Sequence, residues 1–463
     1  MAYATTNPYT GETLKTFPDA TDSDVALALE RGDTAFKQWK NTSIAARVAV
    51  LQNAANLLRA KHTEYAKLLT LEMGKLLSEA EAEVELSAAI FEYYVENAEQ
   101  QLVPEKLPSK DPAVTEAWLV HEPLGIILAI EPWNFPYYQI ARILAPQLSA
   151  GNVIVLKHAS NVPQCADAFE KLMLEAGLPV GGFKNLYASR HQLETIINDS
   201  RVHGVALTGS EGAGAVVAAQ AGRALKKSTM ELGGADAFIV LEDADLDKAA
   251  KWAVFGRHWN AGQVCCSSKR IIVVEAIYDA FLERFIAGVA ALKAGDPLDS
   301  ATALAPLSSQ AAANDVRRQV DEAAAHGATV TVIGAEVPSQ GAFVRPVMLS
   351  GLTKDNPAYY WEFFGPVSLI FKAKDEAEAI EIANDSPFGL GGSVFTQNID
   401  RGRKVAEQIS TGMVYINHPT AVKADLPFGG VRRSGYGREL IGLGLKEFVN
   451  HKLIGVTDID GNF

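Results

Sequence analysis

The chain has 463 residues, with 42 Lys and Arg against 55 Asp and Glu, and a formal net charge of −13. This length predicts two or three domains, because a single core rarely grows beyond about 250–300 residues. Its 48% hydrophobic and 21% charged residues exclude a largely disordered or low-complexity protein. The negative charge disfavours nucleic acid and anionic membranes as partners.

Neither a membrane-spanning helix nor a signal peptide is predicted from the sequence. No apolar run reaches about 18 residues, so no transmembrane helix is predicted. The N-terminal segment lacks the basic and apolar regions of a signal peptide. Three cysteines exclude a disulfide scaffold and fit a reducing compartment. We therefore expect a cytoplasmic protein.

The first hundred residues are predicted to be mostly helical. Apolar residues recur at helical spacing from Asp22, with Thr21 or Ser23 as the cap. A second helical stretch is expected over 43–73 and a third over 76–100. The three prolines within 103–112 predict a loop.

Short β-rich runs then alternate with helical ones. The predicted strands are 117–121, 126–130, 153–156, 205–207 and 237–241, and the predicted helices are 163–176, 192–199 and 212–221. The pattern restarts with strands 270–274, 329–333, 367–371, 393–395 and 413–416 and helices 278–292 and 375–384. This alternation predicts an α/β fold with parallel sheets covered by helices, and a second α/β domain beginning near Leu232.

A glycine-rich turn joins a predicted strand to a helix at 205–214. The backbone N–H groups at a helix N-terminus suit a phosphate. However, the segment lacks the third glycine of a dinucleotide fingerprint, and no Lys-Ser or Lys-Thr follows Gly214. A tight turn with no ligand is as consistent with this segment as a phosphate site.

Three short motifs carry reactive side chains, and each has a plain alternative. Cys265 and Cys266 lie on a turn before strand 270–274, where at most one of two adjacent cysteines faces a pocket; the alternative is a buried small hydrophobe. Such a vicinal pair is a poor metal chelate, so no metal site is predicted. Glu231 precedes two glycines and suits a general base, or is a solvated strand end. Asn134 is held between prolines and suits an oxyanion donor, or forms an Asx turn.

Taken together, seven motifs in one order resemble the aldehyde dehydrogenase superfamily from end to end. They are PWNFP, VLKHAS, LTGSEGAG, ELGG, GQVCCSS, EFFGP and LPFGGVRRSGYGRE. The short N-terminus, the Lys-His-Ala-Ser segment and Arg142 are most similar to the compact bacterial succinate-semialdehyde dehydrogenases.

This resemblance implies two Rossmann-like parallel-sheet domains and a small bridging β element. The cofactor-binding domain is expected at 1–104 and 124–231, and the catalytic domain at 232–434. The bridging element is expected at 105–123 and 435–463, with a hairpin over 105–123 and a closing strand near 449–459. That strand would add to a neighbouring subunit, so a homodimer or homotetramer is expected.

The resemblance also implies a mechanism. Cys265 corresponds to the nucleophile, which forms a thiohemiacetal and then a thioester. Asn134 and the backbone N–H of Cys265 correspond to the oxyanion site. Glu231 corresponds to the base that activates water for hydrolysis of the thioester.

A set of further residues corresponds to the binding sites for NAD or NADP and for the aldehyde. Lys157 matches the adenosine-ribose ligand, Glu362 the nicotinamide-ribose ligand, and Phe364 the nicotinamide neighbour. Trp133, Gly209 and Ser210 match the adenine and pyrophosphate surroundings, and Phe428 matches the lining of the substrate tunnel.

Departures from the family pattern bear on the cofactor and on redox chemistry. Ser160 stands where NAD-preferring members carry Glu, so NADP should be accepted at least as well as NAD. Cys266 directly follows the nucleophile, and is interpreted as a packing residue or a partner in disulfide formation. Cys165 is expected to have no role.

The predicted substrate is succinate semialdehyde, with Arg142 as the anchor for its carboxylate. An ion pair within the protein is the alternative for Arg142. Trp259 stands where many such enzymes carry a second Arg, and Lys423 is a candidate for the missing charge. Glutarate semialdehyde or aliphatic aldehydes are therefore alternative substrates.

Two other functional classes fit the sequence less well. A catalytically silent structural member would have no need for Cys265, Glu231, Asn134, Lys157 and Glu362 together. A CoA-acylating enzyme commonly lacks the base equivalent to Glu231, so its presence favours hydrolysis.

Overall fold

The computed structural model describes residues 3–461. A hairpin of β1 (Tyr3–Thr6) and β2 (Thr13–Phe17) opens the chain. These two strands were not predicted, because each is too short to display a clear hydrophobic period. Within 3–461, no helix is long and apolar enough to cross a membrane.

Four helices follow the hairpin. They are α1 (Asp22–Trp39), α2 (Ile44–Ala60), α3 (His62–Met73) and α4 (Leu77–Gln101). Thr21 caps α1 in a capping box with Asp24, as one of the two predicted caps. The helix predicted over 43–73 is wrong in one respect. It is divided at Lys61, whose φ of −108° leaves the helical region.

The first sheet has six strands in the order β19-β9-β8-β5-β6-β7. Its members are β5 (Ile126–Glu131), β6 (Val153–His158), β7 (Phe183–Asn185), β8 (Val202–Thr208), β9 (Lys227–Glu231) and β19 (Gly435–Tyr436). The intervening helices are α5 (Pro136–Ala150), α6 (Pro163–Glu175), α7 (Arg190–Asn198) and α8 (Glu211–Arg223). The carboxyl ends of β5, β8 and β9 meet at one edge, where ligands bind in such sheets.

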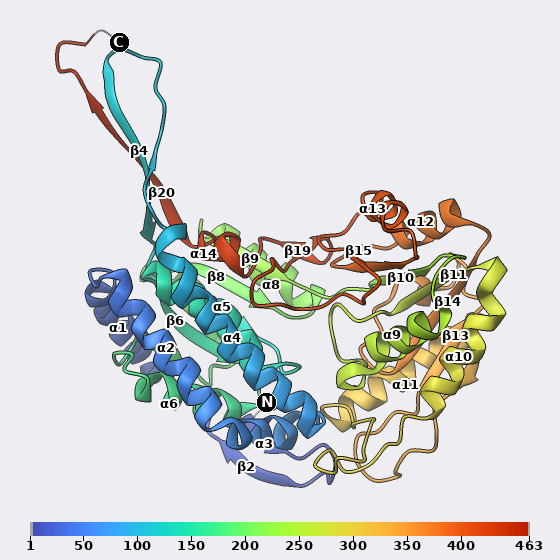
Figure 1. Cartoon of the computed structure of the whole chain (residues 1–463). Helices are drawn as coiled ribbons and strands as arrows, with labels where there is room; N and C mark the ends of the chain where they lie inside the picture. Colours follow the sequence, from blue (N-terminus) through green and yellow to red (C-terminus); the bar gives the residue numbers. More distant parts are fainter. Residues whose placement is uncertain (1–2, 462–463) are drawn as a thin grey trace.

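The second sheet has seven strands in the order β12-β13-β14-β11-β10-β16-β17. They are β10 (Ala237–Val240), β11 (Arg270–Val274), β12 (Thr329–Val332), β13 (Val347–Ser350), β14 (Val367–Ala373), β16 (Gly392–Phe395) and β17 (Tyr415–Ile416). The helices α9 (Leu246–His258), α10 (Tyr278–Ala290), α11 (Gln310–Ala325), α12 (Glu376–Asn384) and α13 (Ile399–Ala406) accompany it. A short pair, β15 (Phe388–Gly389) and β18 (Val431–Arg432), lies outside both sheets. The predicted α/β class with parallel sheets is confirmed (Figure 1).

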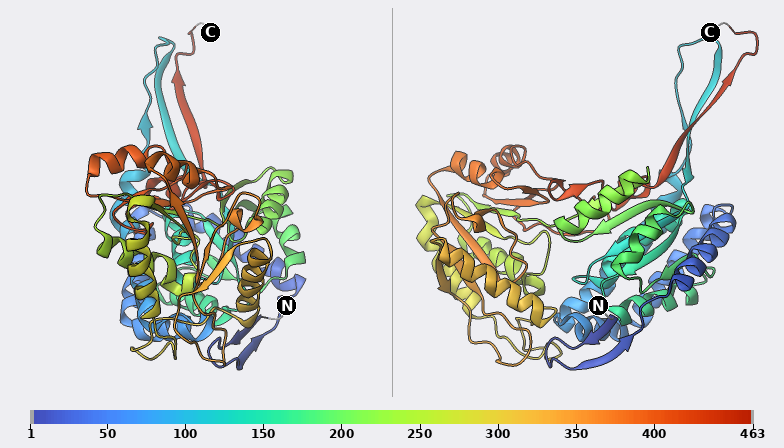
Figure 2. Two further views of the ribbon diagram at one scale, coloured as in Figure 1. Left: turned by 90° about the vertical axis from the view of Figure 1, so that its right-hand side faces the viewer. Right: turned by 180° about the vertical axis from the view of Figure 1, so that it is seen from behind.

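A third, three-stranded sheet projects from the body of the molecule and holds the C-terminal strand (Figure 2). It consists of β3 (Glu105–Lys106), β4 (Val114–Pro123) and β20 (Val449–Thr457). The predicted boundary gave the whole of 435–463 to this projection, but only the later part of that segment belongs to it. Instead β19 pairs with β9, and α14 (Ile441–Leu445) packs on α5.

Candidate active site

Cys265 lies on a loop whose preceding turn has unusual backbone angles. Between α9 and β11, a 3-10 helix at Trp259–Gly262 places Asn260 at φ 52° and Ala261 at φ 53°. The strained turn is held from another part of the chain, because Glu79 at the start of α4 accepts a hydrogen bond from the Asn260 N–H at 2.8 Å. Gly262, at φ +78°, packs so closely on Gly365 that a Cβ would collide with it. The loop is therefore fixed before any ligand binds.

The two adjacent cysteines differ in environment. Cys265 is half-buried and lines a cavity, whereas Cys266 is buried. A hydrogen bond from Cys266 lowers the pKa of Cys265, and nearby Lys269 and Arg142 lower it further. The pKa of Cys266 is raised by the Cys265 thiolate and by burial. These directions, together with its place at the cavity, favour Cys265 over Cys266 as the thiol that ionises.

Lys269 organises this loop, and its role was not predicted from the sequence. Its ammonium group donates hydrogen bonds to the carbonyls of Val264 at 2.6 Å and Cys265 at 2.7 Å. It also pairs with a carboxylate oxygen of Glu362 at 3.0 Å. A lysine beside the reactive cysteine in GQVCCSSK was the available signal.

Asn134 follows β5 and approaches the same loop. Its amide N–H donates to the Gln263 carbonyl at 3.2 Å, and its amide oxygen accepts from Gln139 at 3.3 Å. An amide carries two N–H donors, so one remains for a ligand oxygen. The side chain is buried and oriented before substrate arrives.

Glu231 ends β9 and is buried. Burial raises its pKa to about 8, and Arg142 partly opposes this rise. Its carboxylate lies against Gly429, where a side chain would collide with it. Neither carboxylate oxygen has a hydrogen-bond partner within 3–461. Such a carboxyl group suits a proton acceptor near neutral pH.

A cavity of about 240 Å³ joins most of the predicted groups. Of the predicted residues, its lining contains Trp133, Asn134, Gly209, Ser210, Cys265, Glu362 and Phe364. The rings of Trp133 and Phe364 meet at 88° with centroids 5.6 Å apart. The Glu362 carboxylate accepts from the Gly234 N–H at 3.0 Å. Aromatic walls, a carboxylate for sugar hydroxyls and an opening beside the thiol fit a nicotinamide riboside.

The N-terminus of α8 forms part of the same wall. Ser210 is its N-cap and accepts a hydrogen bond from the Ala213 N–H. The glycine-rich turn predicted at 205–214 is therefore a strand-to-helix junction with its N–H groups at the cavity. This geometry fits a phosphate group.

Lys157 and Ser160 lie at the carboxyl end of β6 and do not line this cavity. Burial and the charge of Arg190 lower the pKa of Lys157. Ser160 is half-buried, and its carbonyl accepts from the Ala4 N–H. Arg190, at the start of α7, was not identified from the sequence and adds a second cation near Lys157.

Arg142, the predicted carboxylate anchor, is bound to the protein itself. It is 1% exposed and forms an ion pair with Glu439. Its guanidinium donates to the Tyr138 hydroxyl at 3.0 Å and the Thr208 hydroxyl at 2.8 Å. The ring of Phe428 lies 5.0 Å from it, and Phe428 is buried. The alternative interaction, an ion pair within the protein, is thus present, and an incoming carboxylate would have to compete with Glu439.

Two further candidates lie elsewhere. Trp259 packs against Phe135, with centroids 5.1 Å apart, and stacks on Phe255. Lys423 is exposed on the segment before Phe428. Neither lines the cavity beside Cys265.

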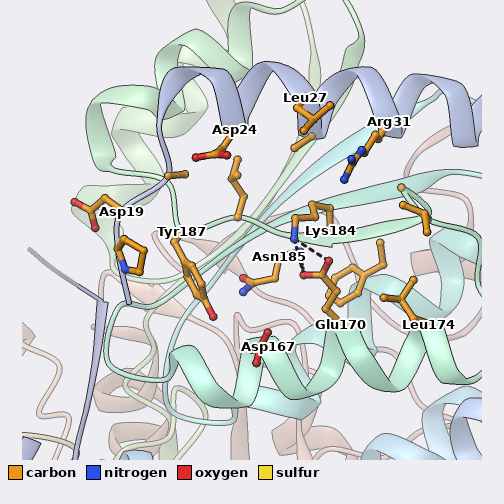
Figure 3. A pocket seen from close by; sticks show the side chains of 17 residues that line it. Asp19, Asp24, Leu27, Arg31, Asp167, Glu170, Leu174, Lys184, Asn185 and Tyr187 are labelled. Carbon is orange, nitrogen blue, oxygen red and sulfur yellow. Dashed lines mark hydrogen bonds and ion pairs between the residues drawn. The ribbon is translucent and has the colours of Figure 1, made fainter. Parts of the chain in front are cut away.

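A second cavity of about 380 Å³ lies between α1, α6 and β7 (Figure 3). None of the predicted site residues lines it. Its Lys184 is already paired with Glu170 at 2.8 Å, as Figure 3 shows. Its lining contains no cysteine, serine or threonine, so we assign the chemistry to the cavity beside Cys265.

The chain is similar to known proteins over nearly its whole length. The aldehyde dehydrogenase family model matches residues 1–454. The chain is 48% identical to succinate-semialdehyde dehydrogenase [NADP(+)] of Deinococcus radiodurans, over 98% of this chain and 94% of that one. It is 45% identical to succinate-semialdehyde dehydrogenase [NADP(+)] 1 of Mycobacterium tuberculosis, over 99% and 100%.

A solved structure is equally similar. Succinic semialdehyde dehydrogenase from Streptococcus pyogenes, in complex with NADP+, has a TM-score of 0.96 and 47% identity, covering 99% of this chain and 100% of that one. The family match, these identities and the cavity beside Cys265 lead to one conclusion. The chain belongs to the aldehyde dehydrogenase family.

Proposed function

We propose that this protein oxidises succinate semialdehyde to succinate, with NADP+ as the hydride acceptor. The observation that carries the proposal is one cavity lined by a thiol of lowered pKa and an oriented amide. The buried carboxyl group of Glu231 does not line this cavity, but it lies close enough to Cys265 for that thiol to raise its pKa. The substrate and the cofactor are inferred from the relatives named above.

The Cys265 thiolate attacks the aldehyde carbon and gives a thiohemiacetal. The unused N–H of Asn134 and the backbone N–H of Cys265 hold the resulting oxyanion. NADP+, when bound, supplies the acceptor for the hydride that this adduct loses. The product of that loss is a thioester on Cys265.

Glu231 then takes a proton from water, which attacks the thioester and releases the acid. The raised pKa of about 8 makes the ionised Glu231 a stronger base toward water, and the ionised fraction grows as pH rises toward 8. The presence of Glu231 favours hydrolysis over transfer to CoA. Turnover measured with and without CoA distinguishes these outcomes.

The adenosine end of the cofactor is assigned to Lys157 and Ser160, with Arg190 as a further cation. The pyrophosphate is assigned to Gly209 and Ser210 at the α8 N-terminus. Glu362 and Phe364 are assigned to the nicotinamide riboside. Trp133, whose ring contacts that of Phe364, is assigned with Gly209 and Ser210 to the adenine and pyrophosphate surroundings.

We assign Arg142 to the substrate carboxylate in competition with Glu439, and Phe428 to the wall beside it. Arg142→Ala is expected to cost succinate semialdehyde about 2–3 kcal/mol in kcat/KM, the scale of a charge-assisted hydrogen bond. Butanal, which has no carboxylate, should change little. Equal losses for both aldehydes would leave Arg142 with a structural role, and the protein would be a broader aldehyde dehydrogenase.

A control variant tests whether Glu439 competes with the substrate carboxylate for Arg142. Glu439→Gln keeps Arg142 and removes its competitor, so it should lower the KM for succinate semialdehyde but not for butanal. The whole proposal is tested by kcat/KM for succinate semialdehyde, glutarate semialdehyde, acetaldehyde and benzaldehyde, each with NAD and NADP.

We further infer a homodimer or homotetramer, formed through the projecting sheet. β20 lies at the edge of that sheet, with its other side paired to β4. The free cysteines suit a reducing compartment, and we place the enzyme in the cytoplasm.

A further inference from the structure

One buried carboxyl group near the reaction site has no part in the mechanism above. Glu131 ends β5, immediately before the PWNFP motif, and is 3% exposed. No well-formed hydrogen bond reaches either of its carboxylate oxygens within residues 3–461. A buried carboxyl group without partners is costly, so its presence calls for a physical reason.

The strand register places Glu131 in line with the proposed base. β8 lies between β5 and β9, and all three strands run parallel. Ile130 is paired with Leu207, and Thr208 is paired with Glu231. Paired residues of parallel strands point to the same face, so Glu131, Thr208 and Glu231 form one row at the carboxyl ends of three adjacent strands.

The Thr208 hydroxyl, at the centre of this row, keeps its own proton free to donate. Arg142 donates to the Thr208 oxygen at 2.8 Å. A guanidinium is always a donor, so the Thr208 oxygen accepts in this bond and its own proton is available to a carboxylate. Thr208 can therefore accept a proton on one side while donating on the other.

The two outer carboxyl groups of the row, those of Glu131 and Glu231, can both be protonated near neutral pH. Burial raises the pKa of Glu131 to about 8, with Arg142 and Thr208 opposing the rise, and Glu231 has a similar pKa. The other groups that face this row are Tyr138 and Arg142 from α5, Glu439 and Arg438 after β19, Glu447 after α14, His158 from β6 and Cys265. His158 is neutral, because burial lowers its pKa to about 4.

We propose that Glu131 receives, through the Thr208 hydroxyl, the proton that Glu231 takes from the hydrolytic water. The O–H bond of the Glu231 carboxylic acid breaks as its proton moves to the Thr208 oxygen. The Thr208 O–H bond breaks in turn, and that proton binds the Glu131 carboxylate. Negative charge moves from Glu131 to Glu231, and nothing is oxidised or reduced.

This transfer makes Glu231 a carboxylate again while the proton waits away from the thioester. The reverse path returns the proton to the cavity once the product has left. Glu131 touches no substrate and acts through Thr208, so it is a positioning residue for the proton. The inference rests on the proposed function, since it needs Glu231 as the base.

Glu131→Gln is the direct test, because it keeps the size of the side chain and removes the proton acceptor. The burst of NADPH, which reports attack and hydride loss, should stay within about twofold. Steady-state kcat should fall roughly tenfold, below the full contribution of a general base. Loss of the Glu131 charge should also move the acidic limb of the kcat–pH profile to lower pH.

Thr208→Val and Thr208→Ser form a matched pair that does not depend on the folding of the Glu131 variant. The serine keeps the hydroxyl, so its kcat should exceed that of the valine variant about tenfold. Adding Glu131→Gln to Thr208→Val should cause no further loss, because both changes break one path.

Two results would overturn the inference: an unchanged kcat and pH profile in Glu131→Gln, or equal loss of burst and kcat. Failure of the proposed function looks different. In that case wild-type protein would not turn over succinate semialdehyde, or Glu231→Gln would keep full kcat. A slow Glu231→Gln variant beside a normal Glu131→Gln variant would remove the proton transfer alone.

Discussion

At the residue scale, the pKa values of the adjacent Cys265 and Cys266 shift in opposite directions because their surroundings differ. Cys265→Ala should abolish thioester formation and turnover. Cys266→Ala should retain most activity but lose the hydrogen bond that lowers the Cys265 pKa, so alkylation of Cys265 should need higher pH. Alkylation rate against pH, read by mass spectrometry, measures this shift.

Cys165→Ala is the matched control, since Cys165 is buried and its pKa is raised well above the usual range by burial and by Glu72. It should change neither turnover nor the alkylation profile. If Cys266→Ala were inactive and Cys265→Ala active, Cys266 would be the nucleophile in place of Cys265.

Asn134 and Glu231 should fail at different steps. Asn134→Ala should slow the burst itself by roughly 10²–10³, the scale of a lost oxyanion donor. Glu231→Gln should keep the burst and lose steady-state turnover. Because the Glu231 pKa is raised to about 8 and the base must be ionised, wild-type deacylation should accelerate as pH rises toward 8. Stopped-flow NADPH traces across pH separate the steps, and an unaffected steady state in either variant would exclude that residue.

At the element scale, we expect the carboxyl end of β6 to set the preference between NAD and NADP. A carboxylate at position 160 would repel a 2′-phosphate, and like-charge contact can cost several kcal/mol. Ser160→Glu should therefore shift preference to NAD, read as the ratio of kcat/KM values. Ser160→Ala, which adds no charge, should keep the NADP preference, and Arg190→Ala should raise KM for NADP alone. A wild type that strongly prefers NAD contradicts this assignment.

Elements differ in how well sequence predicts them. The strands over 270–274 and 126–130 are apolar apart from Arg270 and are buried on both faces, and both are found with boundaries shifted by at most one residue. β7 and β9 were missed because β7 is short and β9 reads KSTME, with no apolar period. β9 is stabilised by its neighbours β8 and β19, which lie far apart in the chain.

At the scale of the whole molecule, the projecting sheet bears on assembly. β20 leaves Leu453 64% exposed, Ile454 44% and Val456 48%. Unpaired edge strands with apolar side chains favour pairing with another chain. Leu453→Glu with Val456→Glu should lower the mass measured by light scattering to that of the monomer. Lys452→Glu, on the same strand but already polar, is the control, and a monomeric wild type would contradict the proposal.

The sequence by itself determined the fold class, the nucleophile motif and the order of the chemical groups. These depend on the local periodicity of apolar residues and on short motifs, and both can be identified directly from the sequence. Asn134 and Cys265 were identified from such motifs and Glu362 from the family resemblance, and the structure brings all three to one cavity.

Only the tertiary structure decided which charges meet. Arg142 and Glu439 are almost 300 residues apart, and burial together makes their pairing strong. The same packing aligns Glu131 with Thr208 and Glu231 across three strands and places Lys269 on the Cys265 loop. Contacts of this kind depend on strand register and burial, which no local pattern encodes.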